Sequence, residues 1–192
     1  MRTIIETAKS FLRLFTLIFE DNFIKTCVEE VDDKLIVKPR VYYYGKAAVQ
    51  HRDIGFFSDK SIGYYYSGQL TESIPLTKNL SILLDSINKY FEADFNGILV
   101  NKYNDGTEYV GAHSDDEKFL DKIGVVALSY GAVRKFRIRD KKTKKIIMDI
   151  PTNSTEIIHM GGNFQKEFTH EIPIEKKIKE IRYSFTFRKN KI

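Results

Sequence analysis

Seven short runs of β-forming residues fill the part of the chain that follows Gly97, and they limit the fold more than any other feature. Each run spans four to seven residues, and turn-forming segments such as Asn104-Asp105-Gly106 and Gly161-Gly162-Asn163 separate them. Short strands at this spacing favour a β-sandwich or jelly roll. We therefore predict strands at Ile98–Tyr103, Val125–Ser129, Phe136–Arg139, Ile146–Ile150, Glu156–Met160, Phe168–Ile172 and Arg182–Arg188.

Helices are predicted to pack on one side of this β structure, which makes the fold mainly β with flanking helices (α+β). One helix should run from about Thr77, which can cap it, to Phe91. Its apolar residues recur at helical spacing: Leu76, Leu80, Leu83, Leu84, Ile87, Tyr90 and Phe91. The first thirty residues show similar spacing, so we expect a helix there too, with an apolar face made by Ile4, Ala8, Phe11, Leu12 and Phe15.

Composition and length indicate one ordinary globular domain spanning residues 1–192. The chain is 42% hydrophobic and 30% charged and has only four prolines, so no linker is evident. Its most apolar stretch, Phe11–Phe19, is interrupted by Arg13 and predicts neither a membrane span nor a signal peptide. The single cysteine, Cys27, excludes an internal disulfide and favours a reducing intracellular compartment, nuclear or cytoplasmic. We expect a monomer.

Basic residues are concentrated in three places in a chain of formal net charge +5. A basic stripe of this kind is typical of proteins that bind a polyanion such as nucleic acid. A solvated lysine-rich loop would give the same pattern, so both interpretations stay open on this feature. The basic residues are Arg134, Lys135, Arg137, Arg139, Lys141, Lys142, Lys144 and Lys145, then Lys176, Lys177 and Lys179, and finally Arg188, Lys189 and Lys191.

A candidate metal site is predicted from His113-Ser114-Asp115 and a later histidine, His170. On an extended backbone, residues two apart share a face, so this imidazole and carboxylate can grip one ion. Two histidines and one carboxylate form the facial triad of non-haem Fe(II) oxygenases, which leaves three coordination positions open. The alternative is that these are ordinary hydrogen-bonded polar residues, because such pairs also arise by chance.

The last predicted strand places two arginines on one face, and this arrangement calls for an anion. Strand alternation separates Arg182, Ser184, Thr186 and Arg188 from Tyr183, Phe185 and Phe187. Inward-facing guanidinium groups are costly unless they meet anions, and a dicarboxylate would pair with them bidentately. The alternative is an edge strand with solvated arginines.

Taken together, these motifs resemble the AlkB family of nucleic-acid dealkylases. The pattern covers roughly residues 38 to 189. Arg182 lies twelve positions after His170 and Arg188 eighteen, spacings similar to those of eukaryotic homologues that repair double-stranded DNA. Several motifs in the right order are more specific than any one of them. They are Asn101-Lys102-Tyr103-Asn104-Asp105-Gly106, His113-Ser114-Asp115-Asp116-Glu117, His170 and Arg182–Arg188.

The resemblance implies a double-stranded β-helix (jelly-roll) core over about residues 98–189 and a nucleotide-recognition lid over about residues 38–68. It implies that Fe(II), 2-oxoglutarate and O2 are used to remove N-alkyl groups from DNA bases, releasing succinate, CO2 and formaldehyde. The catalytic metal ligands would be His113, Asp115 and His170.

For the cosubstrate, the resemblance implies that Arg182 binds the distal carboxylate of 2-oxoglutarate, helped by Asn101 and Tyr103. Arg188 would lie beside the carboxylate that chelates iron. Ser184 replaces the asparagine that is common in the nearest relatives, and it can still donate a hydrogen bond.

For the substrate, the resemblance implies that a base is flipped out and stacked in the lid. Tyr66 would stack on it with Tyr64 nearby, and Tyr44 would fill the gap left in the duplex. The remaining expected contacts, at the base edge or in the lid, are Asp116, Glu117, Arg52 and Phe57.

Three alternatives to DNA dealkylation stay open at this point. The same scaffold serves RNA demethylation. A catalytically silent nucleic-acid-binding module could retain the fold, although the intact triad and both arginines argue against it. A hydroxylase of proteins or small molecules could share the iron site, but the tyrosine-rich lid and the basic flanks disfavour it.

Overall fold

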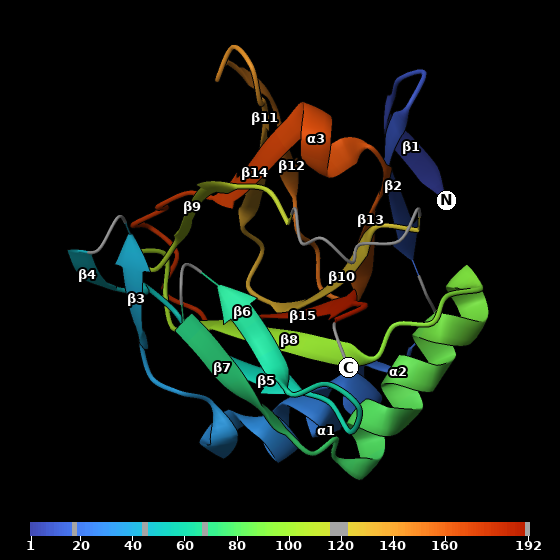
Figure 1. Ribbon diagram of the computed structural model, residues 1–192, viewed down its shortest axis with the longest axis vertical. Coiled ribbons are helices and arrows are strands. Elements are labelled where there is room, and N and C mark those ends of the chain that lie inside the picture. Colours follow the sequence, from blue (N-terminus) through green and yellow to red (C-terminus); the bar gives the residue numbers. More distant parts are fainter. Residues whose placement is uncertain (17–18, 44–45, 67–68, 116–122, 191–192) are drawn as a thin grey trace.

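The computed structural model describes residues 1–16, 19–43, 46–66, 69–115 and 123–190, and these form two packed β-sheets with the two longer helices on one side (Figure 1). The larger sheet has nine strands, in the order β1 (Arg2–Glu6), β2 (Ser10–Thr16), β13 (Glu156–Gly162), β10 (Val125–Gly131), β15 (Arg182–Arg188), β8 (Gly97–Tyr103), β5 (Asp53–Phe57), β7 (Gln69–Ile74) and β6 (Gly63–Tyr66).

The smaller sheet lies over one face of the larger sheet and carries a long hairpin at its edge (Figure 1). Its four strands follow the order β12 (Ile146–Pro151), β11 (Lys135–Asp140), β14 (Phe168–Ile172) and β9 (Val110–His113). A separate hairpin pairs β3 (Arg40–Tyr43) with β4 (Lys46–Val49). The helical segments are α1 (Asp21–Val31), the 3-10 turn η1 (Asp32–Lys34), α2 (Lys78–Phe91) and the short α3 (Phe164–Glu167).

The predicted jelly-roll architecture is confirmed, and all seven predicted strands are present. Their bounds agree to within two residues, and Phe168–Ile172 and Arg182–Arg188 match at both ends. The sequence did not predict β9, because Val110-Gly111-Ala112-His113 is too short and too poor in β-branched residues to stand out. This short strand nevertheless brings His113 opposite His170 in the antiparallel pair β9–β14.

Strand β15 shows why the two faces of the larger sheet differ. Tyr183, Phe185 and Phe187 pack in the core between this sheet and the helices. Each fully buried aromatic or aliphatic side chain in that core contributes roughly 1.5–3 kcal/mol. The alternate residues of β15 face the smaller sheet, as predicted, and they line a cavity between the two sheets: Arg182, Ser184, Thr186 and Arg188.

Helix α2 forms as its sequence predicts. The Thr77 hydroxyl accepts a hydrogen bond from the Leu80 amide at 3.2 Å and caps the helix. The helix ends at Glu92, whose φ of +50° is left-handed. Leu80, Leu83 and Ile87 are fully buried against the larger sheet, so the apolar stripe faces the core.

The helix predicted over the first residues is wrong, because this segment forms the hairpin β1–β2. Leu12 and Leu14 alternate toward the inter-sheet core, whereas Phe15 packs against the core on the helical side. Both faces of β2 are thus covered, so its apolar residues lack the strict alternation of a half-exposed strand. Their accidental i, i+4 spacing imitates a helix, and the first real helix begins at Asp21.

Two expectations from composition concern the environment of the chain. No helix within the described residues has the length and apolarity that crossing a bilayer requires. Cys27 lies fully buried on α1, where burial, and secondarily the nearby Glu30 carboxylate, raises the pKa of its thiol to about 12. This cysteine is therefore a small apolar core residue with an unreactive thiol.

Candidate metal centre

The cavity between the two sheets brings together side chains from β8, β9, β14 and β15. Its wall combines apolar residues, such as Leu99 and Ile158, with polar groups that converge from opposite strands. Convergent polar groups in an otherwise apolar cavity are the usual sign of a binding site.

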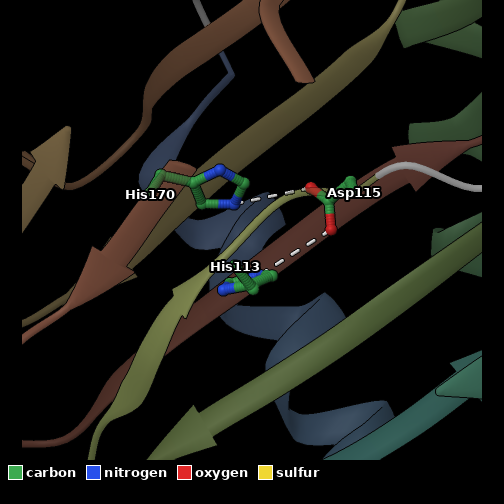
Figure 2. A group of neighbouring side chains, drawn as sticks. All are labelled: His113, Asp115 and His170. Carbon is green, nitrogen blue, oxygen red and sulfur yellow. Dashed lines mark ion pairs between the residues drawn. The ribbon is translucent and has the colours of Figure 1, made fainter. Parts of the chain in front are cut away.

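His113, Asp115 and His170, which all line this cavity, point toward one another (Figure 2). His113 Nε2 lies 3.8 Å from one carboxylate oxygen of Asp115, and His170 Nε2 lies 3.5 Å from the other. The three ligand atoms are all within 4.8 Å of one another, so a single ion could touch them all. The predicted convergence of the two histidines and the aspartate is confirmed.

Both imidazoles are held in the form that a metal needs. Burial lowers the pKa of His113, and burial together with the neighbouring His113 lowers the pKa of His170 to about 3. The rings are therefore neutral at neutral pH. His113 Nδ1 lies 2.8 Å from the Gly111 carbonyl and must donate to it, which leaves a lone pair on the Nε2 atom that faces Asp115.

Asp115 is ionised, although burial by itself would raise its pKa. The Arg188 guanidinium, with smaller contributions from the two imidazoles, holds the pKa of this carboxyl well below its usual range. Arg188 Nη2 donates to Asp115 Oδ1 at 3.1 Å. Arg188 thus fixes one carboxylate oxygen and keeps a negative charge at the candidate metal position.

Arg182 is held rigidly while part of its guanidinium stays available. Its Nε donates to Thr152 Oγ1 at 3.1 Å, and its Nη2 donates to Ser129 Oγ at 3.0 Å. The buried Nη1 atom has no hydrogen-bond partner among the described residues. Burial lowers the pKa of Arg182 to about 10, so the group stays cationic at neutral pH.

The remaining predicted cosubstrate residues also line this cavity. The Tyr103 ring centre lies 5.3 Å from Arg182 Cζ, and Ser184 projects from β15 into the same space. Asn101 lines the cavity too, and its Oδ1 accepts a hydrogen bond from Arg52 Nε at 2.7 Å. The sequence suggested Arg52 only as a lid residue, whereas the structure buries it in the cavity wall.

The charges of the cavity wall fit an anionic ligand with two carboxylates. Among the described residues that line it, three bring a guanidinium group, Arg52, Arg182 and Arg188, and one brings a carboxylate, Asp115. A buried N–H without an acceptor is costly. A dicarboxylate would give Arg182 Nη1 the acceptor that it lacks among the described residues.

The structure places the predicted lid residues in different environments. Tyr64 is buried on β6, lines the cavity, and lies under Arg188 Cζ at 4.9 Å from its ring centre. Tyr66 ends the same strand. Phe57 requires a correction, because it is fully buried in the core beside the helices, where strand alternation directs it away from the cavity. Outside the described residues lie Tyr44, Asp116 and Glu117.

The basic segment from Arg134 to Lys145 is also corrected in part. Arg134 is buried, Arg137 pairs with Asp149, and Arg139 pairs with Glu171. Strand alternation explains the two ion pairs, because Arg137 and Arg139 project to one side of β11, where Asp149 of β12 and Glu171 of β14 meet them. Arg134 precedes β11 and is held by loop carbonyls. The lysines of the β11–β12 turn, by contrast, stay at the surface.

The sequence-family comparison decides the class of this site. The model of the 2OG-Fe(II) oxygenase superfamily matches residues 21–188. The chain belongs to this superfamily. The expected cofactors, Fe(II) and 2-oxoglutarate with O2, are therefore confirmed, and the triad and the arginine cavity lie inside the matched range.

Individual relatives confirm the resemblance to AlkB-family dealkylases. The chain is 27% identical over 188 residues to the DNA oxidative demethylase ALKBH2 of Homo sapiens, covering 94% of this chain and 72% of the relative. It is 32% identical over 118 residues to the alpha-ketoglutarate-dependent dioxygenase alkB homolog 3 of Bos taurus, covering 57% and 41%. The solved structure of OsALKBH1 shares the fold, with a TM-score of 0.60 at 15% identity over 98% of this chain and 100% of that chain.

Proposed function

We propose that this oxygenase removes N-alkyl groups from bases in DNA, the activity named for its ALKBH2 relatives. The observation that carries the proposal is the convergence of His113, Asp115 and His170 in the same cavity as the buried guanidinium of Arg182. A neutral pair of imidazoles and an ionised carboxylate form the donor set for Fe(II), and an arginine with an open N–H suits a dicarboxylate.

The polar residues of the site then have distinct roles. His113, Asp115 and His170 would hold the iron, and Arg188 keeps Asp115 ionised and oriented. Arg182 binds the distal carboxylate of 2-oxoglutarate, with the remaining contacts made by Asn101, Tyr103 and Ser184. When bound, iron with 2-oxoglutarate and O2 supplies the oxidant that hydroxylates an N-alkyl carbon, so that the alkyl group leaves as an aldehyde, formaldehyde for methyl.

The substrate proposal extends to how the base is presented. A base must leave the duplex to reach a buried metal, and aromatic side chains would hold it there. Tyr64 lines the cavity and suits this role. We further propose that Tyr66 stacks on the flipped base and that Tyr44 fills the gap left in the duplex. Asp116 and Glu117 would contact the edge of the base. The enzyme would act as a monomer of one domain, with the lid over residues 38–68, in the nucleus or cytoplasm.

The test is turnover of a matched panel of methylated oligonucleotides. Single-stranded DNA, duplex DNA and RNA of one sequence would be incubated with Fe(II) and 2-oxoglutarate, and demethylated base and formaldehyde would be quantified. We expect DNA to be repaired, with duplex substrate tolerated. Asp115→Ala should lower the rate by at least about 100-fold, because it removes a ligand of the metal.

Asp149→Ala is the matched control, because this carboxylate pairs with Arg137 on the smaller sheet and does not line the cavity. It should keep nearly full activity. Strong preference for methylated RNA would move the substrate to RNA and leave the oxygenase chemistry intact. Full turnover by Asp115→Ala would contradict the assigned iron site.

A further inference from the structure

The segment that carries Asp115 lies just beyond the end of a strand pair. The pairing of β9 with β14 ends where His113 faces His170. Asp115 follows two residues later, and its main-chain N–H donates to Oε1 of Gln165 at 2.9 Å. A side chain from another segment therefore takes the place of a strand partner at this metal-binding position.

Gln165 is well placed to act as a fixed support. It lies on α3, between β13 and β14, and is only 7% exposed. Its main-chain carbonyl accepts a hydrogen bond from Lys141 Nζ at 2.9 Å, and its Nε2 lies 3.7 Å from Met160 Sδ. Gln165 does not line the cavity, so it cannot itself be a ligand of the metal or the cosubstrate.

A second contact ties the same segment to the same region. The hydroxyl of Ser114 donates to the carbonyl of Phe168 at 3.0 Å, one residue after α3 ends. Residues 114 and 115 are thus held at two successive positions by the turn that leads into β14. Since β14 also carries His170, this turn links the aspartate to the second histidine.

We propose that Gln165 is a positioning residue that sets the affinity of the site for its divalent metal by fixing the main chain at Asp115. The inference rests on the proposed role of Asp115 as an iron ligand. Without the Gln165 acceptor, the Asp115 amide loses its hydrogen bond, and the carboxylate can rotate away from the two imidazoles. Arg188 would still donate to one carboxylate oxygen, but it would not fix the main chain at Asp115.

The experiment measures Mn(II) binding, because Mn(II) takes the same N and O ligands and resists oxidation. Titrations would be followed by the electron paramagnetic resonance of free Mn(II). Gln165→Leu keeps the size of the side chain but removes the acceptor. We expect its Kd for Mn(II) to rise by about 10-fold or more, the usual effect of losing a hydrogen bond that orients a ligand. Gln165→Glu keeps an acceptor at the same reach, so its Kd should stay within about threefold of the wild-type value.

Asn88→Leu is the matched control for lost stability. Its Oδ1 also accepts a main-chain amide bond, from Phe95 at 2.8 Å, but it lies on α2 on the far side of the larger sheet. This variant should have a lower Tm and an unchanged Kd for Mn(II). Gln165→Leu should instead change the Kd far more than the metal-free Tm.

Two results would overturn the positioning role. One is an unchanged Kd in folded Gln165→Leu, and the other is an equal loss of Mn(II) affinity in Asn88→Leu. Failure of the proposed substrate looks different, because methylated DNA would then stay unrepaired while Gln165→Leu still bound Mn(II) more weakly than wild type. A wild-type protein that binds no Mn(II) would contradict both the iron site and its support.

Discussion

Arg182 and Arg137 show how differently two arginines of the same protein can be used. Arg137 makes a bidentate pair with Asp149 on the smaller sheet, with the two oxygens at 2.7 and 2.8 Å. Arg182 is instead bound through Nε and Nη2 by two hydroxyl groups, and its Nη1 is buried with no partner among the described residues. The charge of Arg137 is thus neutralised within the fold, whereas Arg182 keeps an N–H that can donate to a ligand.

Arg182→Lys should therefore weaken 2-oxoglutarate binding by roughly tenfold or more. A lysine keeps the charge but cannot bond Thr152, Ser129 and a carboxylate in one planar arrangement. The measurement is isothermal titration of 2-oxoglutarate into the Mn(II)-loaded protein. Arg137→Lys is the control and should bind 2-oxoglutarate as wild type does. Equal affinities for all three proteins would mean that another residue anchors the cosubstrate.

His159 is a residue whose titration should affect stability without touching the iron site. It lies 8% exposed on β13 among the rings of Phe11, Phe15 and Phe91, and its Nε2 is 2.6 Å from the Ile123 carbonyl. Burial lowers the pKa of His159 below its unfolded value of about 6.5. Unfolding therefore takes up a proton as the pH falls. The stability that neutral His159 contributes is complete above about pH 6.5 and is lost progressively below it.

His159→Gln should flatten this pH dependence. In urea unfolding of the metal-free protein at about pH 7.5 and about pH 5.5, the wild type should lose more unfolding free energy than the variant. His113 and His170 are shifted in the same direction and contribute to both proteins, so the difference isolates His159. Parallel losses would show that the imidazole of His159 titrates normally in the fold.

Which site residues were predictable depended on their chemistry. His113, Asp115 and His170 are residue types with few structural uses together, and the alternation of β15 separated Arg182 from the core-facing aromatic residues. Their supports are chemically ordinary. Serine, threonine and glutamine occur throughout the chain, and nothing local distinguishes those that hold an arginine or an aspartate: Ser129, Thr152 and Gln165.

At the scale of elements, the side chain of Arg134 connects two loops of the smaller sheet through hydrogen bonds. It is 1% exposed, and its guanidinium donates to the carbonyls of Asp105, Glu108 and Pro173 at 2.8–3.0 Å. Its Nε also lies 3.3 Å from Glu175 Oε2. One buried cation thereby joins the loop before β9 to the loop after β14, the two strands that carry the histidines.

Arg134→Met should cost about 3 kcal/mol of unfolding free energy, because it leaves several buried acceptors without a donor. Chemical denaturation monitored by circular dichroism would measure this loss. Arg137→Met is the control, because its pair with Asp149 is partly exposed, and it should cost about 1 kcal/mol or less. Similar costs for the two variants would contradict the special role of Arg134.

The elements also show where pattern recognition from sequence succeeds. Strands of the jelly roll and helix α2 have strong patterns with clear caps or turns, and they were predicted closely. Strand β2 was not, because its two faces are covered by residues far away in the sequence: the core between the two sheets on one face, and Phe91 at the end of α2 on the other. The arginines of β11 likewise resembled a basic surface in the sequence, because their acidic partners, Asp149 and Glu171, lie on other strands and are brought to them only by the fold.

At the scale of the whole molecule, the two faces of the larger sheet are specialised. Helices α1 and α2 cover one face, and the smaller sheet with the iron site covers the other (Figure 1). The β11–β12 hairpin extends from this second side, and its turn carries Lys142, Lys144 and Lys145 in exposed positions. Since Arg137 and Arg139 are paired within the fold, these lysines are better candidates than the arginines of β11 for contacting nucleic-acid phosphates.

The changes Lys142→Gln, Lys144→Gln and Lys145→Gln, made together, should therefore weaken DNA binding and reduce its salt dependence. Each phosphate contact contributes about 0.9 to the slope of log affinity against log salt, so the slope should fall by about one unit for each contact removed. Fluorescence anisotropy of a labelled duplex across a salt series measures both quantities.

The control carries Lys25→Gln, Lys78→Gln and Lys89→Gln, which are exposed on α1 and α2. Both triple variants lower the formal net charge of +5 by the same three units, so a difference between them reports position and not total charge. We expect the helical variant to keep nearly the wild-type slope and the hairpin variant to have a smaller slope, lower by about one unit for each phosphate contact removed. Equal slopes would mean that the protein attracts DNA only through its net charge and that the hairpin makes no phosphate contacts of its own.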